Sequence, residues 1–107
     1  MKAEAEFIWI YVTTKDEVQA KGIARALLEQ KLVACANITK EMQSLYWWQG
    51  KIVEDNESVL ILKTTTDKFN AVESAIKKMH SYEEPCIIAL PIVAGSKGYL
   101  SWLRNQS

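Results

Sequence analysis

The N-terminal third of the chain changes from a strand pattern to a helix pattern. Residues 7–12 form a continuous apolar run, which is typical of a strand buried on both faces. Thr14 and Glu17 then have the spacing of a capping box at the start of a helix. Apolar residues recur at helical intervals after it, at Ala20, Ile23, Ala24 and Leu27. We predict a strand followed by a helix that ends near Lys31.

The middle of the chain predicts extended backbone and one long hairpin. Residues 32–39 are extended and apolar, and the polar residues 40–43 interrupt them as either a bulge or a break in a long strand. Residues 44–63 then contain two strand-like runs, Tyr-Trp-Trp at 46–48 and Val-Leu-Ile-Leu at 59–62. Between the two runs, Gln49 and Gly50 favour a tight reversal.

The C-terminal third predicts a helix, a strand and a short last helix. Asp67 is a candidate cap for a helix whose apolar residues recur at intervals of three and four, at Phe69, Val72, Ile76 and Met79. That helix should stop at 80–81, because Pro85 favours extended backbone before it. Residues 87–93 predict a fourth strand, and residues 99–103 a short amphipathic helix.

This order of elements predicts an α+β fold. Strand, helix, strand, strand, helix, strand is the βαββαβ order of the ferredoxin-like fold, an antiparallel sheet with two helices on one face. We expect one domain over residues 1–107 plus the short C-terminal helix. The aromatic hairpin carries more apolar surface than a chain of this size covers easily, so we predict that another subunit packs against it.

Composition and charge narrow the class of protein. Thirteen basic residues balance thirteen acidic ones without a basic stripe, which argues against a nucleic-acid partner. No apolar run approaches the ~20 residues of a membrane span, so we expect no membrane association and a cytoplasmic location. Cys35 and Cys86 lie in apolar extended segments, and we expect two buried free thiols.

His80 is the only histidine, which excludes a metal box or a triad that needs two imidazoles in one chain. It falls at the predicted end of the second helix, where it either makes a structural hydrogen bond or contacts a metal or ligand.

Two charged features of the hairpin suggest opposite environments. The run that contains Lys51, Glu54, Asp55 and Glu57 is typical of a solvated hairpin tip. Lys63 instead ends an apolar run, so it needs a carboxylate, such as Glu57 of another chain, or a bound anion. No nucleophile elbow, phosphate loop or nucleophile–base pair is visible, so we do not expect an enzyme.

Several motifs, taken in order, resemble the CutA family of divalent-cation tolerance proteins over nearly the whole chain. They are Leu-Val-Ala-Cys-Ala-Asn at 32–37, Ser-Leu-Tyr-Trp-Trp-Gln-Gly-Lys-Ile at 44–52 with Glu54 and Glu57, Leu-Lys-Thr at 62–64, His-Ser-Tyr-Glu-Glu-Pro at 80–85, Leu-Pro at 90–91 with Gly95, and Tyr-Leu-Ser-Trp-Leu at 99–103.

The resemblance implies a stable homotrimer with exchanged hairpins, similar to the nitrogen-regulatory PII proteins. It also implies a role in tolerance of copper or another divalent cation. Some bacterial members are described as binding copper through a cysteine on the first strand and a pair of histidines. Those positions hold Val12 and Met79-His80 here, so His80 is the residue that carries over.

The resemblance further implies a ligand cleft between subunits. The residues that map onto it are Asn37, Trp48, Glu57, Lys63 and Tyr82. A lysine facing a carboxylate and aromatic walls suits an anion or a small metabolite. The favoured function is a trimer that binds a divalent cation or small ligand between subunits. The alternative is a trimeric scaffold or signalling protein that acts through a protein partner without a metal site.

Overall fold

The computed structural model describes residues 5–107 and confirms the predicted α+β fold. The strands are β1 (Phe7–Thr14), β2 (Cys35–Ile38), β3 (Met42–Trp48), β4 (Lys51–Thr65) and β5 (Ile87–Pro91). The helices are α1 (Glu17–Glu29), α2 (Phe69–Met79) and α3 (Lys97–Gln106), with a 3-10 turn at Thr66–Lys68. None of these helices is long and apolar enough to cross a bilayer.

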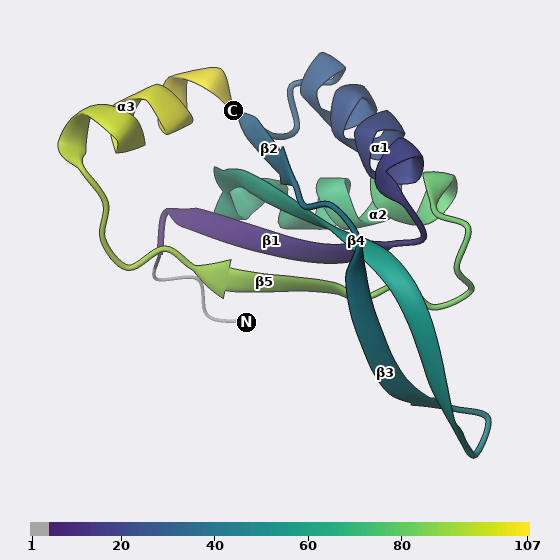
Figure 1. Ribbon diagram of the computed structural model, residues 1–107. Helices are drawn as coiled ribbons and strands as arrows, with labels where there is room; N and C mark the ends of the chain where they lie inside the picture. Colours follow the sequence, from purple (N-terminus) through teal and green to yellow (C-terminus); the bar gives the residue numbers. More distant parts are fainter. Residues whose placement is uncertain (1–4) are drawn as a thin grey trace.

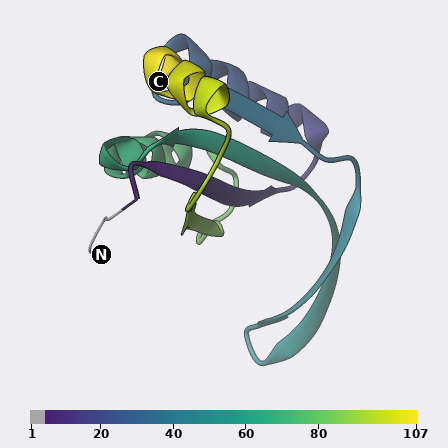
Figure 2. The same cartoon turned by 90° about the vertical axis from the view of Figure 1, so that its left-hand side faces the viewer.

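The sheet has the antiparallel order β2-β4-β1-β5, with β3 paired to the distal half of β4 (Figure 1). This is the strand order of the predicted ferredoxin-like arrangement, with β3 added. The distal part of β4 and all of β3 leave the body as a two-stranded arm, which curves away from the sheet in the second view (Figure 2). We call residues 42–57 the arm.

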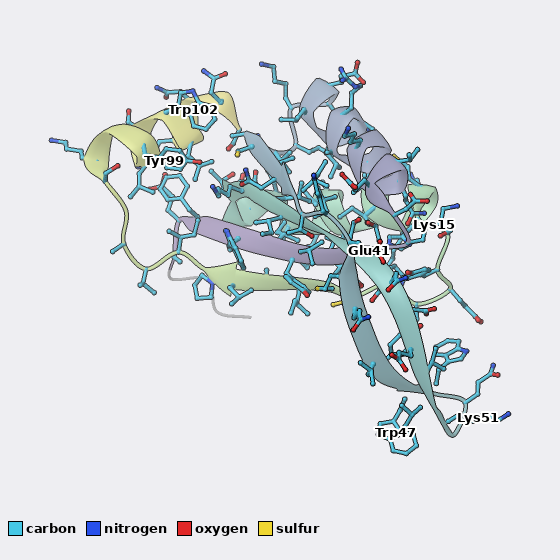
Figure 3. The ribbon with its side chains drawn as sticks, viewed as in Figure 1. Lys15, Glu41, Trp47, Lys51, Tyr99 and Trp102 are labelled. Atoms are coloured by element: carbon cyan, nitrogen blue, oxygen red, sulfur yellow. The ribbon has the colours of Figure 1, made fainter. Side chains whose placement is uncertain are left out.

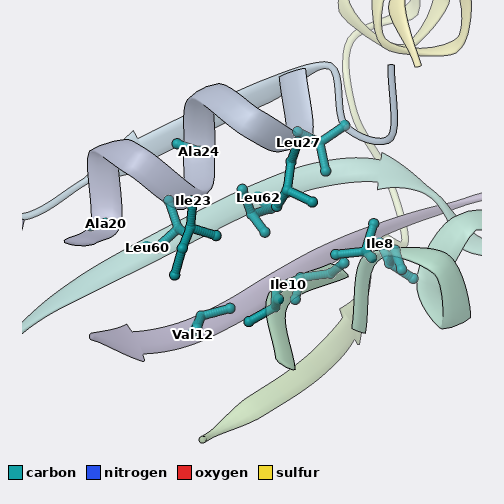
Figure 4. Packing of buried hydrophobic residues seen from close by; sticks show 12 residues of the cluster. Ile8, Ile10, Val12, Ala20, Ile23, Ala24, Leu27, Leu60 and Leu62 are labelled. Atoms are coloured by element: carbon teal, nitrogen blue, oxygen red, sulfur yellow. The ribbon is translucent and has the colours of Figure 1, made fainter. Parts of the chain in front are cut away.

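The core lies between the sheet and the two helices α1 and α2 (Figure 4). Because side chains alternate along a strand, Ile8, Ile10 and Val12 of β1 point to the same face as Leu60 and Leu62 of β4. The face of α1 that was predicted from its spacing completes this core, with Ala20, Ile23, Ala24 and Leu27 buried.

The other face of the sheet is covered at one end by α3. Phe7 and Lys63 lie on this face, and α3 supplies Arg104 over the Phe7 ring and Tyr99 beside Lys63. Arg104 also forms a bidentate ion pair with Glu6, with 2.9 Å from Nη2 to Oε1. The chain therefore covers part of its own open sheet face with α3.

The N-caps of α1 and α2 differ from the residues that the sequence predicted. The N-cap of α1 is Asp16, which accepts a hydrogen bond from the Gln19 amide at 2.8 Å, while the Thr14 hydroxyl donates to the carbonyl of Ser58 instead. Asp67 does not cap α2, because the 3-10 turn places Lys68 at the N-cap without a side-chain hydrogen bond. At its far end, α1 closes with Lys31 at φ 60.

The polar interruption before the arm is a break that contains one extra residue. Ile38 pairs with Leu60 and Met42 with Glu57, so three residues on one strand face two on the other. The Thr39 hydroxyl accepts from the Val59 amide at 2.9 Å, which satisfies that amide across the break. At the tip, Gln49 and Gly50 both have positive φ, as the predicted tight reversal requires.

The cap assignment gives the first prediction. Asp16→Ala should lower the free energy of unfolding by about 1 kcal/mol, because it removes the N-cap hydrogen bond of α1. Asp67→Ala is the matched control, and it should lower the free energy of unfolding by less than about half of that amount. Urea denaturation followed by circular dichroism measures both, and an equal or larger loss for Asp67→Ala would contradict the assignment.

Candidate functional site

A groove of about 720 Å³ lies where the arm leaves the body, on the sheet face opposite the core. Its wall on the body side comes from Tyr11 and Thr13 of β1 and from the segment before β5. Its wall on the arm side comes from β3, with Trp48 near the tip. The full lining is Tyr11, Thr13, Met42, Gln43, Ser44, Leu45, Tyr46, Trp48, Glu57, Tyr82, Glu83, Glu84 and Cys86.

Glu57 is the buried carboxylate of this groove. It retains only 6% of its exposed surface, and its Oε2 accepts a hydrogen bond from the Tyr82 hydroxyl at 2.7 Å. Burial, followed by the hydrogen bond and the negative charge of Glu57, raises the pKa of Tyr82 well above its usual value. Among residues 5–107, no basic side chain forms a salt bridge with Glu57. The sequence prediction of a solvated position for Glu57 is therefore wrong.

A second tyrosine–carboxylate pair lies further along the arm. The Tyr46 hydroxyl donates to Oδ2 of Asp55, and this hydrogen bond raises the pKa of Tyr46 to about 12. Tyr46 pairs across the hairpin with Val53, so the bond to Asp55 crosses the ladder diagonally. The two pairs together hold two phenols and two carboxylates along one side of the arm.

His80 connects the end of α2 to the groove. It is the C-cap residue of α2 and is 9% exposed. Its Nδ1 accepts from the Tyr82 amide at 3.1 Å, which makes Nε2 the donor to the Thr13 carbonyl at 2.8 Å. Both ring nitrogens are thus engaged by backbone groups, in the structural role that the sequence left open.

The thiol of Cys86, which lines the groove, is a weak candidate for a metal ligand. Burial, followed by the charge of Glu57, raises the pKa of the Cys86 thiol, which disfavours the thiolate that metals bind. Both cysteines are free, as predicted, but they are partly exposed and not buried. Across residues 5–107, no three His, Cys, Asp or Glu side chains are placed to hold one metal ion.

The predicted cleft residues divide into two places. Trp48, Glu57 and Tyr82 line the groove together. Asn37 and Lys63 lie on the same sheet face toward α3, and Lys63 is about 20 Å along β4 from Glu57. The Lys63 ammonium is 3.3 Å from the Tyr99 hydroxyl and 5.4 Å from the centre of the Tyr99 ring. Within one chain, therefore, Lys63 interacts with Tyr99 and does not reach Glu57.

Sequence reasoning named Tyr82 on the body side of the groove but missed the part that β1 supplies, Tyr11 and Thr13. Tyr11 was assigned to a buried strand, although its neighbours Ile10 and Val12 face the core and it faces the groove. The alternation of β1 contains the signal that could have placed it, since a tyrosine between core residues points to the other face. Tyr46 and Asp55 give no comparable signal, because their pairing depends on the hairpin register.

Known proteins resemble this chain over almost all of its length. Residues 8–106 match the family model of the CutA1 divalent ion tolerance protein. The chain is 44% identical to the divalent-cation tolerance protein CutA of Thermus thermophilus over 98 residues, covering 92% of this chain and 95% of that protein. It is 40% identical to the chloroplastic protein CutA 1 of Oryza sativa over 94% of this chain, which spans 56% of that longer protein.

A solved structure has the same fold. The structure described as the periplasmic divalent cation tolerance protein CutA from Archaeoglobus fulgidus superposes with a TM-score of 0.91. It is 43% identical in sequence, and the match covers 94% of this chain and 97% of that one.

The Tyr46–Asp55 pair predicts a late alkaline titration. In the difference between wild type and Tyr46→Phe, near-ultraviolet tyrosinate absorbance should appear only as the pH approaches about 12. Because this pKa lies above the ordinary value of about 10, the pair's stabilisation is complete below about pH 10 and is lost as the pH rises through about 12.

The matched variants are Asp55→Asn, which should lower the pKa of Tyr46, and Glu54→Gln, which should not. An unchanged titration in Asp55→Asn would show that the hydrogen bond to Asp55 is not the cause.

Proposed function

This chain belongs to the family of CutA1 divalent ion tolerance proteins, and from that membership we propose that it is a trimeric binding protein of the cytoplasm. It takes part in the response to divalent cations such as copper by binding a cation or a small ligand at clefts between subunits. In this it resembles the PII proteins, and it acts by binding and not by catalysis. The observation that carries the proposal is the exposed apolar arm.

The arm displays apolar side chains that the rest of the described chain does not cover. Trp47 is 72% exposed and Ile52 is 64% exposed, and the two pair with each other across the hairpin. Figure 3 shows Trp47 at the far end of the arm, away from the body. Ile88 and Leu90 of the edge strand β5 are also exposed on the open sheet face. Apolar surface at the arm and at a sheet edge favours association with further copies.

The groove is the proposed ligand cleft, and a neighbouring subunit would complete it. Trp48, Glu57 and Tyr82 supply one side from the arm and the body of one chain. Lys63 lies toward the opposite end of the same sheet face, and Asn37 lies between the two, on β2 opposite Ile61. In a closed ring of copies, the α3 end of one subunit can face the groove end of the next, which would bring both groups into one cleft.

Two observations support binding without catalysis. The raised pKa of the Cys86 thiol keeps this potential nucleophile protonated at neutral pH. Both nitrogens of the His80 imidazole are hydrogen-bonded to backbone groups, so the ring is not available as a general base without loss of those bonds. The groove instead presents phenols and carboxylates, which suit the recognition of a ligand.

The trimer gives the next prediction. Sedimentation at micromolar concentration should yield three times the chain mass of 12.2 kDa. Ile52→Asp should weaken assembly at least about tenfold, because it would place an unpaired charge in an apolar interface. The matched control is Val18→Asp on α1, where an aliphatic residue is 80% exposed outside the arm. A wild-type monomer, or equal effects of the two substitutions, would contradict this assembly.

The metal ligand assigned by resemblance is tested separately. His80→Ala should lower the free energy of unfolding by about 2 kcal/mol, because the Thr13 carbonyl and the Tyr82 amide both lose their partner. Copper(II) and zinc affinities, measured by calorimetric titration of the folded variant, should change less than twofold. A large loss of copper affinity would instead make His80 a metal ligand in the assembled protein.

A further inference from the structure

The two ends of the open sheet face carry charges of opposite sign. Glu57 lies at the groove end with 6% of its surface exposed, and Lys63 lies half-buried at the α3 end. The two residues are about 20 Å apart along β4. Within residues 5–107 neither side chain forms a salt bridge. The counter-charge of each therefore has to come from outside these residues.

The proposed trimer supplies that partner. In a closed ring every subunit meets the next through two different patches, which must be complementary. When the α3 end of one copy faces the groove end of the next, each contact contains one ammonium and one carboxylate. Tyr82 occupies Oε2 of Glu57, so Oε1 is left to accept a hydrogen bond from Lys63 of the neighbouring subunit. The ring then contains three identical pairs.

Tyr99 of α3 fixes the position of the Lys63 ammonium. The ammonium donates a hydrogen bond to the Tyr99 hydroxyl at 3.3 Å and lies 5.4 Å from the centre of the ring. The cross-strand neighbours of Lys63 are Trp9 and Cys35, and neither is an acid. A lysine side chain has many rotamers, so a neighbour that binds an ammonium already held in place costs less conformational entropy. Tyr99 therefore prepares Lys63 for a contact outside its own chain.

The packing of α3 determines where Tyr99 lies. Arg104 holds the helix to Glu6 through an ion pair and to the Phe7 ring through a cation–π contact. The Trp102 ring lies 5.5 Å from the Tyr99 ring, centre to centre. Figure 3 shows both rings on α3, at the end of the molecule opposite the arm. The body of the chain thus places the Tyr99 hydroxyl without help from a neighbour, as a preorganised contact requires.

We propose that Tyr99 is a positioning residue of the cleft between subunits. Its hydroxyl and ring hold the Lys63 ammonium at the α3 end of the sheet, where that ammonium pairs with Glu57 of the neighbouring subunit. This inference rests on the proposed function, because it adds a residue to the cleft that the trimer forms. The family resemblance did not include Tyr99 among the cleft residues.

A double-mutant cycle tests whether Glu57 and Lys63 meet across the subunit boundary. The measured quantity is the trimer dissociation constant, obtained by sedimentation in a urea concentration that partly dissociates the wild type. Glu57→Gln and Lys63→Met should each raise this constant at least about tenfold. The double variant should raise it no more than about threefold beyond the single variant that assembles less well. Residues about 20 Å apart in one chain act additively, so additive effects would overturn the inference.

Two matched substitutions control for the loss of a charge alone. Glu84→Gln removes a carboxylate from an exposed position that also lines the groove, and its effect should add to that of Lys63→Met within about twofold. Lys21→Met removes an exposed ammonium from α1, on the other side of the sheet, and should change the dissociation constant less than about twofold. Coupling of Lys63 to Glu84 in place of Glu57, or an equal effect of Lys21→Met and Lys63→Met, would overturn the inference.

The role of Tyr99 is tested through Lys63. Tyr99→Phe keeps the ring and removes the hydroxyl, and on its own it should raise the trimer dissociation constant about three- to tenfold. In the Lys63→Met background the same substitution should change the constant less than about twofold, because Tyr99 then has no ammonium to position. An equal effect in both backgrounds would give Tyr99 a merely structural role, and no effect in either would mean that the hydroxyl does not position Lys63. Both results would overturn the inference.

Lys63→Arg provides a test that does not depend on the folding of Glu57→Gln. Arginine retains the positive charge, so Lys63→Arg should assemble within about threefold of the wild type, whereas Lys63→Met should not. An equal loss of assembly in these two variants would overturn the inference. A wild type that sediments as a trimer while the cycle is additive contradicts the inference alone, whereas a monomeric wild type contradicts the proposed function.

Discussion

The backbone pairing of β4 is the interaction on which the rest of the structure depends. Its 15 residues pair with β1 on one side and with β2 and then β3 on the other. The half between β1 and β2 has an apolar face that packs under α1 and α2. The half beyond the body has only β3 beside it, because β1 ends opposite Ser58. One strand thus belongs both to a packed sheet and to an exposed two-stranded arm.

The extra residue at the break between β2 and β3 decides which side chains of β3 line the groove. With continuous pairing from β2 into β3, Glu41 would lie opposite Glu57, and two like charges would face each other. The extra residue places Met42 there instead and turns Tyr46 and Trp48 to the same side as Glu57. The aromatic and acidic character of the groove therefore depends on a shift of one residue. The Thr39 hydroxyl stabilises this shift by accepting a hydrogen bond from the Val59 amide.

A short chain of hydrogen bonds connects the helical layer to that groove. His80 ends α2, and its ring donates a hydrogen bond to the Thr13 carbonyl on β1 and accepts one from the Tyr82 amide. The Tyr82 hydroxyl in turn donates a hydrogen bond to the Glu57 carboxylate on the arm. The position of the Glu57 carboxylate is thus tied to the body through groups that are largely buried. Such a chain gives the carboxylate a defined direction, which a binding site requires and a solvated hairpin tip does not.

The sequence by itself determined the elements, their order and the faces of the helices, because these follow from local periodicity and turn chemistry. The core positions of α1, the reversal at Gln49-Gly50 and the end of α2 at His80 all agree with the structure. The predictions of the helix caps were wrong, because the N-cap positions are occupied by Asp16 in α1 and by Lys68 in α2. The loop before each helix sets which residue takes the N-cap position, and residue type alone does not fix that geometry.

Only the tertiary structure decided the environment of each polar residue. Glu57 is buried and Lys63 lies beside α3 because of strand register and the return of the C-terminal helix over the sheet, which are contacts between distant parts of the chain. The family resemblance named Trp48, Glu57 and Tyr82 as members of one cleft, and these three do line one groove, but it could not separate Lys63 from them within one chain. A local pattern specifies to which face of a strand each side chain points. Which residues of different strands lie close together depends on how the whole sheet is paired.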